Sequence, residues 1–235
     1  MNIYDNIDIF VNCSGKSGGC TLYDTFILDN YKTIRSHNNY EFKYNNSNNI
    51  SLFDVINMNN NKNIYIIDSY RNPIERKISS FFENINSYLP NYNKLSVEEI
   101  INFFNDNNFI YNLEEYHSIN EIFDHYNMPR FNNFNFDTKY NIFKKDNKIF
   151  IKIRFNDIKD WSNILSKIFN KNIIIQNSNL SINKVYFNIY NQFIEKYKVP
   201  MKFLEENLSN DMEFKIYNSR DEQEDYFNKW IIKSC

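Results

Sequence analysis

All three glycines of this 235-residue chain lie in one short segment, together with a lysine and several side chains that carry a hydroxyl or a thiol. The segment reads Cys-Ser-Gly-Lys-Ser-Gly-Gly-Cys-Thr and runs from Cys13 to Thr21. The chain contains no alanine and is rich in Asn, Ile, Phe, Tyr and Lys, so glycine and alanine are rare in it. Three glycines kept within one loop therefore indicate that this loop requires glycine. Glycine is needed where the backbone takes a positive φ or approaches a ligand closely. Backbone N–H groups, hydroxyls and a lysine in one loop predict binding of a phosphate or a sulfate ester.

The residues on either side of this loop predict a strand before it and a helix after it. Residues 7–11 read as a buried strand, and residues 21–28 have apolar positions at helical spacing. This order aims backbone N–H groups and a helix N-terminus at an anion. The nucleotide-binding motif G-x-x-x-x-G-K-[ST] is not satisfied, because its first glycine would fall at Phe10. A turn that uses its glycines only for tightness is the alternative interpretation.

A second segment with chemically useful side chains follows the third predicted strand. It reads Arg-Asn-Pro-Ile-Glu-Arg-Lys-Ile-Ser and runs from Arg71 to Ser79. We predict a helix here, with Asn72 as N-cap, Pro73 at the first helical position and Glu75 completing a capping box. Arg71 would stand at the N-terminus of this helix and Ser79 about two turns inside it, so that both side chains are expected to reach one anion.

The remaining pattern predicts strands that alternate with helices in one α/β domain. Strands are expected at residues 7–11, 31–37, 63–69, 148–155 and 173–175. Helices are expected at residues 21–28, 51–58, 72–85, 96–105, 157–170, 185–198, 201–208 and 220–232, with helical segments up to about 125 and a loop at 131–140. Ser96 and Glu99 form a further capping box, and the helix after Asn72 has a buried stripe of Ile74, Ile78, Phe81 and Ile85, with Arg76, Ser79 and Glu83 off it. Polar residues that end the first three strands are expected at one sheet edge, where open α/β sheets bind ligands.

Composition limits the class of protein. The length suits one domain that buries a core of its own. The net charge of −2 indicates no broad basic surface for nucleic acid or membrane. The three cysteines, Cys13, Cys20 and Cys235, predict neither a disulfide framework nor a metal site. No apolar run approaches about 18 residues and no signal peptide opens the chain, so we expect a soluble cytoplasmic protein. The sequence does not indicate an oligomeric state.

The two segments together resemble those of sulfotransferases that use 3′-phosphoadenosine 5′-phosphosulfate (PAPS). In that family a first loop of the type Lys-Ser-Gly-Thr-Thr holds the 5′-phosphosulfate. Residues Lys16–Thr21 match it, with one residue more before the final hydroxyl. The second family motif, Arg-x-Pro-x-x-Arg-x-x-Ser, matches Arg71–Ser79 closely. The resemblance implies that Arg71 and Ser79 bind the 3′-phosphate.

Further segments agree less closely with the same family. The tripeptide Arg-Ser-His that ends at His37 resembles the Lys-Thr-His that ends the second strand in cytosolic members, where the histidine is the base. Arg154–Ile158 resembles the family's Arg-Tyr-Glu-Asp-Leu, with Asn156 in place of the glutamate. Asn183–Tyr186 and Asn228–Trp230 resemble a branch associated with capsular polysaccharide synthesis. The resemblance spans most of the chain and is specific in its first 85 residues.

The resemblance implies a P-loop-type three-layer α/β/α fold with a central, mostly parallel sheet and a helical C-terminal region. It implies a single domain over residues 1–235, with a cofactor-binding core at 1–85, a helical acceptor-side insertion at 86–140 and C-terminal helices at 183–235. PAPS would be the cofactor and PAP its product, with no metal required. The cofactor-binding residues that it implies are Ser14, Gly15, Lys16, Ser17, Gly18, Gly19, Cys20, Thr21, Arg71 and Ser79.

The implied reaction is in-line transfer of a sulfuryl group to an acceptor hydroxyl or amine, catalysed by positioning and electrostatics. Lys16 and the loop amides would stabilise the leaving phosphate, and His37 would take the proton of the acceptor. Glu41 is the reserve base, while His117 and His125 are expected on the surface of a helix. The family implies a glycan acceptor, ahead of protein tyrosine and small molecules.

Two other functions stay open. A P-loop kinase or NTPase needs an acidic Mg²⁺ ligand after a strand, and Asp68 could supply it. A sulfotransferase-like binding module without turnover is the other alternative. For Arg71, a salt bridge to Asp68 or Glu75 is the alternative to a phosphate contact.

Overall fold

The computed structural model describes residues 4–37, 42–44, 48–60, 62–110, 119–176 and 184–232. The chain divides into two compact units, each described here by itself. The first unit comprises Met1–Arg71 and Tyr116–Asn179, and the second comprises Asn72–Glu115 and Leu180–Cys235. The reserve base Glu41 lies outside the described residues, as do His117, Asn183 and Cys235.

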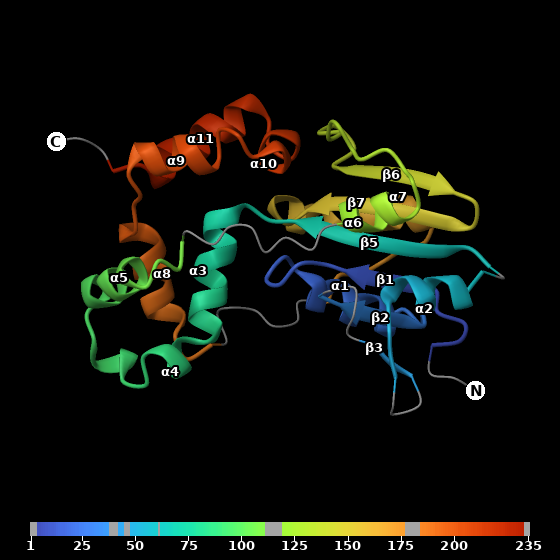
Figure 1. The fold of residues 1–235 in the computed structure, drawn as a ribbon, viewed down its shortest axis with the longest axis horizontal. Helices are drawn as coiled ribbons and strands as arrows, with labels where there is room; N and C mark the ends of the chain where they lie inside the picture. Colours follow the sequence, from blue (N-terminus) through green and yellow to red (C-terminus); the bar gives the residue numbers. More distant parts are fainter. Residues whose placement is uncertain are drawn as a thin grey trace. The chain divides into compact units, whose positions relative to one another are not determined.

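The first unit contains a five-stranded sheet with the strand order β2-β1-β5-β7-β6 (Figure 1). The strands are β1 (Ile9–Asn12), β2 (Thr33–Ser36), β5 (Ile64–Tyr70), β6 (Tyr140–Lys145) and β7 (Lys148–Arg154). All neighbours are parallel except β6, which runs antiparallel to β7. A separate antiparallel pair is formed by β3 (Phe42–Tyr44) and β4 (Asn48–Ile50). The predicted α/β class and mostly parallel sheet are confirmed.

Helices cover both faces of the large sheet. They are α1 (Gly19–Leu28), α2 (Leu52–Met58), α6 (Ile119–His125), α7 (Trp161–Phe169) and the 3₁₀ segment η2 (Phe155–Asp160). Val11 and Ile67 belong to a core with α1 and α7, while Phe10 and Ile66 belong to another core with α2 and α6. Successive strand residues point to opposite faces, so a strand buried on both sides reads as an unbroken apolar run.

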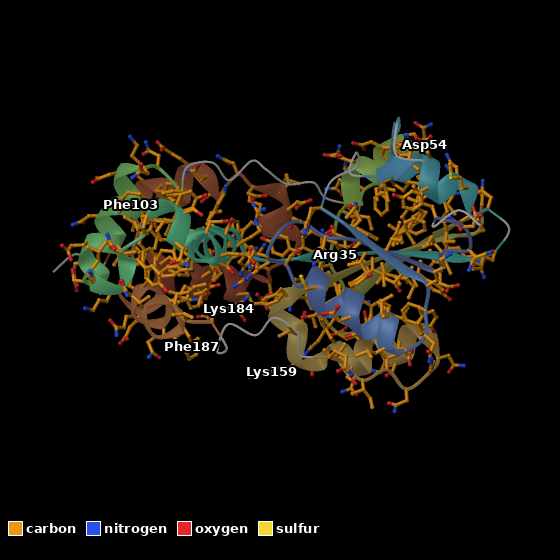
Figure 2. The ribbon with its side chains drawn as sticks, turned by 90° about the horizontal axis from the view of Figure 1, so that it is seen from below. Arg35, Asp54, Phe103, Lys159, Lys184 and Phe187 are labelled. Carbon is orange, nitrogen blue, oxygen red and sulfur yellow. The ribbon has the colours of Figure 1, made fainter. Side chains whose placement is uncertain are left out.

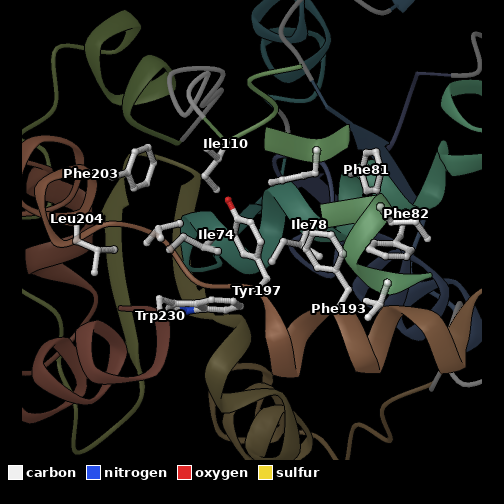
Figure 3. Close-up of a cluster of buried hydrophobic side chains, with 14 of the residues drawn as sticks. Ile74, Ile78, Phe81, Phe82, Ile110, Phe193, Tyr197, Phe203, Leu204 and Trp230 are labelled. Atoms are coloured by element: carbon white, nitrogen blue, oxygen red, sulfur yellow. The ribbon is translucent and has the colours of Figure 1, made fainter. Parts of the chain in front are cut away.

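The second unit is helical and confirms the predicted helical C-terminal region. Its elements are α3 (Pro73–Glu83), α4 (Ile85–Tyr88), η1 (Tyr92–Lys94), α5 (Val97–Asp106), α8 (Phe187–Lys196), α9 (Met201–Asn207), α10 (Met212–Ile216) and α11 (Arg220–Trp230). Aromatic rings fill its core, where Phe81, Phe193 and Trp230 are buried (Figure 3). Phe81 lies edge to face with Phe104 at 5.1 Å between ring centroids, a favourable arrangement for two rings.

The buried stripe predicted for α3 is confirmed. Ile74, Ile78 and Phe81 of α3 are each 2% exposed or less, as is Ile85, which begins α4 because α3 ends at Glu83. Arg76 was expected off this stripe and is nevertheless buried, with 6% of its surface exposed. More of the surface of α3 is therefore buried than its apolar stripe predicts.

The capping box predicted for α5 is confirmed, whereas the one predicted for α3 is wrong. Ser96 accepts a hydrogen bond from the N–H of Glu99 at 3.2 Å, and the Glu99 carboxylate accepts from the N–H of Ser96 at 2.7 Å. Asn72 precedes α3 but makes no capping bond with its side chain. Its Oδ1 accepts from Asn218 at 3.0 Å, and Glu75 accepts from Tyr226 and Lys229. Distant partners therefore replace the local bonds at α3.

The strand predicted at residues 173–175 is wrong. The N–H of Ile173 donates to Ser166 Oγ at 2.9 Å, and its carbonyl oxygen accepts from Ser162 Oγ at 2.6 Å. Because side chains of α7 satisfy this backbone, it has no need of a strand partner. The fifth strand is β6, which the sequence reading missed together with the short helix α10.

No helix in the part of the chain that the structure describes is long and apolar enough to cross a membrane. In the same residues, no cluster of three or more His, Cys, Asp and Glu side chains is placed to hold a metal ion.

Candidate anion-binding site

The glycine loop joins β1 to α1 in the first unit, and the fold itself requires glycine at Gly18 and packs closely at Gly19. Gly18 is the N-cap of α1 and has a φ of 94°, in the left-handed region. A Cβ atom there would lie 2.5 Å from Trp161 Cη2, so the backbone angle and the packing both exclude a side chain. A Cβ at Gly19 would lie 3.1 Å from Cβ of Cys13.

Gly15 is not explained by the fold in this way. A Cβ added to Gly15 would meet no atom within 4 Å, and the φ of Gly15 lies outside the left-handed region. Among the described residues, the space beside its backbone is open. This is the arrangement expected where a ligand, rather than the protein, approaches the chain closely.

The start of α1, which follows the loop, has hydrogen-bond donors of its own. The first N–H groups of a helix have no partner within the helix, and the N-cap residue here, Gly18, has no side chain to cap them. The first turn also contains no acidic residue that would oppose an anion. These donors and the positive end of the helix dipole favour a bound anion.

Lys16 lies in the same loop in a strained conformation. Its φ of 67° is in the left-handed region, which costs an L-residue about 1–2 kcal/mol. Ser17 holds the turn in place, because its Oγ donates to the carbonyl oxygen of Ser14 at 2.6 Å and the residue is fully buried. Strain of this kind is common at functional sites. The Ser17 hydroxyl, which the resemblance assigns to the cofactor, serves the loop in this structure.

Arg71 connects the second motif to the glycine loop. Its Nη1 donates to the carbonyl oxygen of Lys16 at 2.7 Å, across 55 positions of sequence. Its guanidinium carbon lies 4.5 Å from the centroid of the Phe155 ring, a cation–π contact. The same phenylalanine lies 3.1 Å from the position that a Cβ of Gly18 would take. Phe155 therefore packs against both halves of the candidate site.

The carboxylates that could have paired with Arg71 bind other groups. Asp68 forms a buried ion pair with Lys152, in which both side chains are 1% exposed, and also accepts from the N–H of Ile119 at 3.1 Å. Glu75 binds Tyr226 and Lys229. A buried carboxylate held by a lysine is poorly available to Mg²⁺, so this environment disfavours the role that a kinase would require of Asp68.

His37, the candidate base, is attached to the beginning of the loop. Its Nδ1 lies 3.0 Å from the carbonyl oxygen of Cys13. Because a carbonyl oxygen can only accept, Nδ1 carries the proton, and Nε2 is the basic nitrogen of the neutral ring. Ser36 beside it donates to Asn12 at 3.0 Å, which joins the ends of β2 and β1. His37 and Lys16 are thus connected to one loop.

The two cysteines near the loop are free thiols in different surroundings. Burial, followed by the nearby Asp68 carboxylate, raises the pKa of the Cys13 thiol far above its usual range, so Cys13 is a packing residue. Cys20 is partly exposed and accepts a hydrogen bond from the guanidinium of Arg35. Arg35 lies near the end of β2, beside the start of α1 (Figure 2).

The segment that follows β7 supports the loop from the side. Arg154 binds Asp157 through two hydrogen bonds of 2.7 and 3.0 Å, and both side chains are buried. Trp161 donates to the carbonyl oxygen of Arg154 at 2.9 Å, which fixes the ring that faces Gly18. Sequence reasoning missed Phe155 and Trp161 as neighbours of the loop. The match of Arg154–Ile158 to a family segment was the signal that pointed to this region.

The remaining predicted ligand lies in the other unit. Ser79 is a half-exposed residue of α3 in the second unit, whereas Arg71 belongs to the first unit, where it ends the segment Met1–Arg71. A shared 3′-phosphate for these two residues stays a prediction.

No protein-family model, curated protein or solved structure matches this chain. The fold and the site define it as an α/β protein with a five-stranded, mostly parallel sheet and a helical C-terminal region. Its β1–α1 loop contains Gly15 and Lys16 and leads into the N-terminus of α1, and Arg71 donates to the Lys16 carbonyl oxygen.

Proposed function

We propose that this chain is a PAPS-dependent sulfotransferase with a P-loop-type three-layer α/β/α fold, which transfers sulfate to a hydroxyl group of a glycan. One observation carries the proposal: the hydrogen bond of 2.7 Å between the Arg71 guanidinium and the Lys16 carbonyl oxygen. The two segments that resemble this family are far apart in sequence, and a sulfotransferase needs them together. The open space beside Gly15 supports the same interpretation.

In this proposal the glycine loop binds the 5′-phosphosulfate and stabilises the leaving group. The acceptor oxygen forms a bond to sulfur while the bond between sulfur and the bridging phosphate oxygen breaks. Lys16 and the N–H groups at the start of α1 stabilise the negative charge that develops on that oxygen. His37 Nε2 takes the proton of the acceptor hydroxyl, with Nδ1 held by Cys13. The products are the sulfated acceptor and PAP.

Arg71 is the proposed ligand of the 3′-phosphate, and Ser79 is the second ligand that the family motif implies. An arginine carries five N–H donors, so Arg71 can keep its bond to Lys16 while other donors bind phosphate. Its ring contact with Phe155 would hold the guanidinium plane in position.

A P-loop kinase or NTPase is less well supported. Phe10 stands where its first glycine belongs, and Asp68 is buried against Lys152. A binding module without turnover shares the proposed site and differs only in activity.

Transfer of ³⁵S-labelled sulfate from PAPS tests the proposal. Neutral oligosaccharides, a tyrosine peptide and 2-naphthol would serve as acceptors, with ATP–Mg²⁺ hydrolysis measured in parallel. We expect labelled oligosaccharide, and no label from a His37→Ala variant. PAP binding without transfer to any acceptor would favour the binding module, and ATP hydrolysis without PAP binding would favour the kinase.

A further inference from the structure

We propose that a groove in the first unit, between the segment 129–139 and β6, binds a neutral oligosaccharide. The groove has a volume of about 630 Å³, within the range of about 300–1,000 Å³ that is usual for ligand sites. Four asparagines and three aromatic residues line it. We infer sugar binding from this lining alone. That the groove is the acceptor site of a sulfotransferase rests in addition on the proposed function.

The wall of the groove is built by two asparagines. Asn135 Oδ1 accepts from the N–H groups of Asp137 and Thr138 at 3.1 and 3.0 Å. Asn141 Oδ1 accepts from the N–H of Asn135 at 2.9 Å, and its Nδ2 donates to the carbonyl oxygen of Asn133 at 2.5 Å. These bonds tie the segment to β6, so the groove is formed before any ligand arrives.

The other two asparagines are available to a ligand. Asn132 and Asn133 are exposed, and their side chains make no hydrogen bond within the described ranges of the chain. A carboxamide both donates and accepts, which matches the hydroxyl groups of a sugar. Asn133 contributes only its main chain to the wall, so its side chain can bind without disturbing the segment.

Apolar surface lies between these polar groups. Ile142 is 48% exposed, and Phe131 is held edge to face against Phe123 at 5.0 Å. Tyr140, a third aromatic residue of the lining, is half-buried. A mixture of flat apolar surface and amide groups suits a sugar ring, which presents C–H groups on its faces and hydroxyls at its rim.

The charge of the lining selects a neutral ligand. Among the described residues that line the groove there is no carboxylate, and Arg130 is the single cation. Arg130 binds Asp124 through Nε at 3.0 Å and through Nη2. An anion would therefore gain little there, in contrast to the glycine loop. The groove complements the anion site rather than repeating its chemistry.

The register of the sheet places one end of the groove at the edge that carries the loop. Tyr140 pairs with Ile153 of β7, and Ile153 pairs with Ser69 of β5, two positions before Arg71. Ligands of open α/β sheets bind at this carboxyl edge. The groove is thus oriented as an acceptor site would need to be.

Nuclear magnetic resonance titrations of the full chain with maltotetraose, cellotetraose, xylotetraose, laminaritetraose and chitotetraose test the proposal. We expect at least one to saturate with a Kd below about 1 mM and to shift amide signals of residues 129–143. The double variant Asn132→Ala, Asn133→Ala should weaken that binding about 10-fold or more, and Ile142→Arg should abolish it. Asn163→Ala is the matched control, because Asn163 is an exposed residue of α7.

The absence of saturation with all five sugars would overturn the proposal, as would binding that both groove variants leave unchanged. Binding of only an anionic oligosaccharide, such as a heparin tetrasaccharide, would also contradict it. PAP titrated into the same samples separates this inference from the proposed function. Sugar binding without PAP binding supports the groove and contradicts the sulfotransferase.

Discussion

Two glycines in one loop have different reasons for being glycine. Gly18 needs its positive φ and has Trp161 against the position of a Cβ, whereas Gly15 needs neither. If a phosphate occupies the space beside Gly15, a methyl group added at Gly15 will weaken phosphate binding. A methyl group added at Gly18 will instead lower the stability of the fold.

Alanine substitutions at these two positions test this distinction. Gly18→Ala should lower the free energy of unfolding by about 2–4 kcal/mol, from left-handed strain and overpacking. Gly15→Ala should change it by less than about 0.5 kcal/mol, the usual range for surface changes, while weakening the binding of PAP. Urea denaturation and calorimetric titration measure the two effects. Equal losses of stability in both variants would contradict the assignment.

Lys16 is the residue on which the proposed chemistry depends most. Lys16→Ala should lower the rate of sulfate transfer by about 10²–10³-fold, the usual effect of losing one donor to the transition state. Lys167→Ala is the control, because Lys167 is an exposed lysine of α7 and should leave the rate unchanged. A Lys16→Ala variant that keeps more than half of its turnover would remove Lys16 from the mechanism.

The candidate site could be predicted from sequence only where its chemistry is local. The loop itself and Arg71 each stand in a recognisable motif. Phe155 and Trp161 are ordinary aromatic residues in a chain that has 18% aromatic residues, so their residue type did not distinguish the two that contact the loop. Their roles follow from packing between distant segments.

At the scale of elements, the two predicted capping boxes show when local reasoning succeeds. Ser96 and Glu99 are both exposed at the start of a helix, and they form the reciprocal hydrogen bonds that the sequence predicts. Asn72 and Glu75 have Asn218, Tyr226 and Lys229 as tertiary partners, which the sequence pattern does not reveal.

Removal of the Ser96 cap should weaken the second unit. Ser96→Ala is expected to lower the free energy of unfolding by about 1 kcal/mol, as is usual for a lost N-cap. Ser80→Ala is the control, since Ser80 is an exposed residue within α3. Guanidinium denaturation of the two variants measures the difference, and equal midpoints would show that the cap contributes nothing.

The same cap makes stability depend on pH. Hydrogen bonds from the Ser96 N–H and hydroxyl lower the pKa of Glu99 in the folded protein. A lowered pKa adds stability above the unfolded value of about 4.3, and that stability is lost as the pH falls through the folded value. The wild type should therefore exceed Glu99→Gln in stability by more at pH 7 than at pH 3. A difference that stays constant between these values would contradict the assignment.

Strand prediction failed at two segments, a strand that was missed and a strand that does not form. The segment Tyr140–Lys145 reads Tyr-Asn-Ile-Phe-Lys-Lys, without a regular alternation of apolar and polar residues. Asp146 and Asn147 form a two-residue turn to β7, and Asp146 has a φ of 53°. That turn chemistry was the available signal for a hairpin. Three consecutive isoleucines at 173–175 suggested a strand instead, although side chains of α7 already satisfy the backbone of Ile173.

At the scale of the whole molecule, the chain consists of an α/β unit and a helical unit with separate cores. Alternation of strands and helices in the sequence was sufficient to predict the α/β class and the helical C-terminal region. It was not sufficient to predict the assignment of segments to units, because α3 to α5 join the C-terminal helices only through contacts distant in sequence.

The proposed function requires the protein to recognise a 3′-phosphate through Arg71, and calorimetric titration of PAP and AMP measures this recognition. These ligands differ only in that phosphate. The wild type should bind PAP more tightly than AMP. Arg71→Ala should weaken the binding of PAP by about 1.5–3 kcal/mol and change the affinity for AMP little. Loss of binding of both PAP and AMP in this variant would indicate damage to the loop that Arg71 contacts. Equal affinities of the wild type for PAP and AMP, or no binding of either, would contradict the claim.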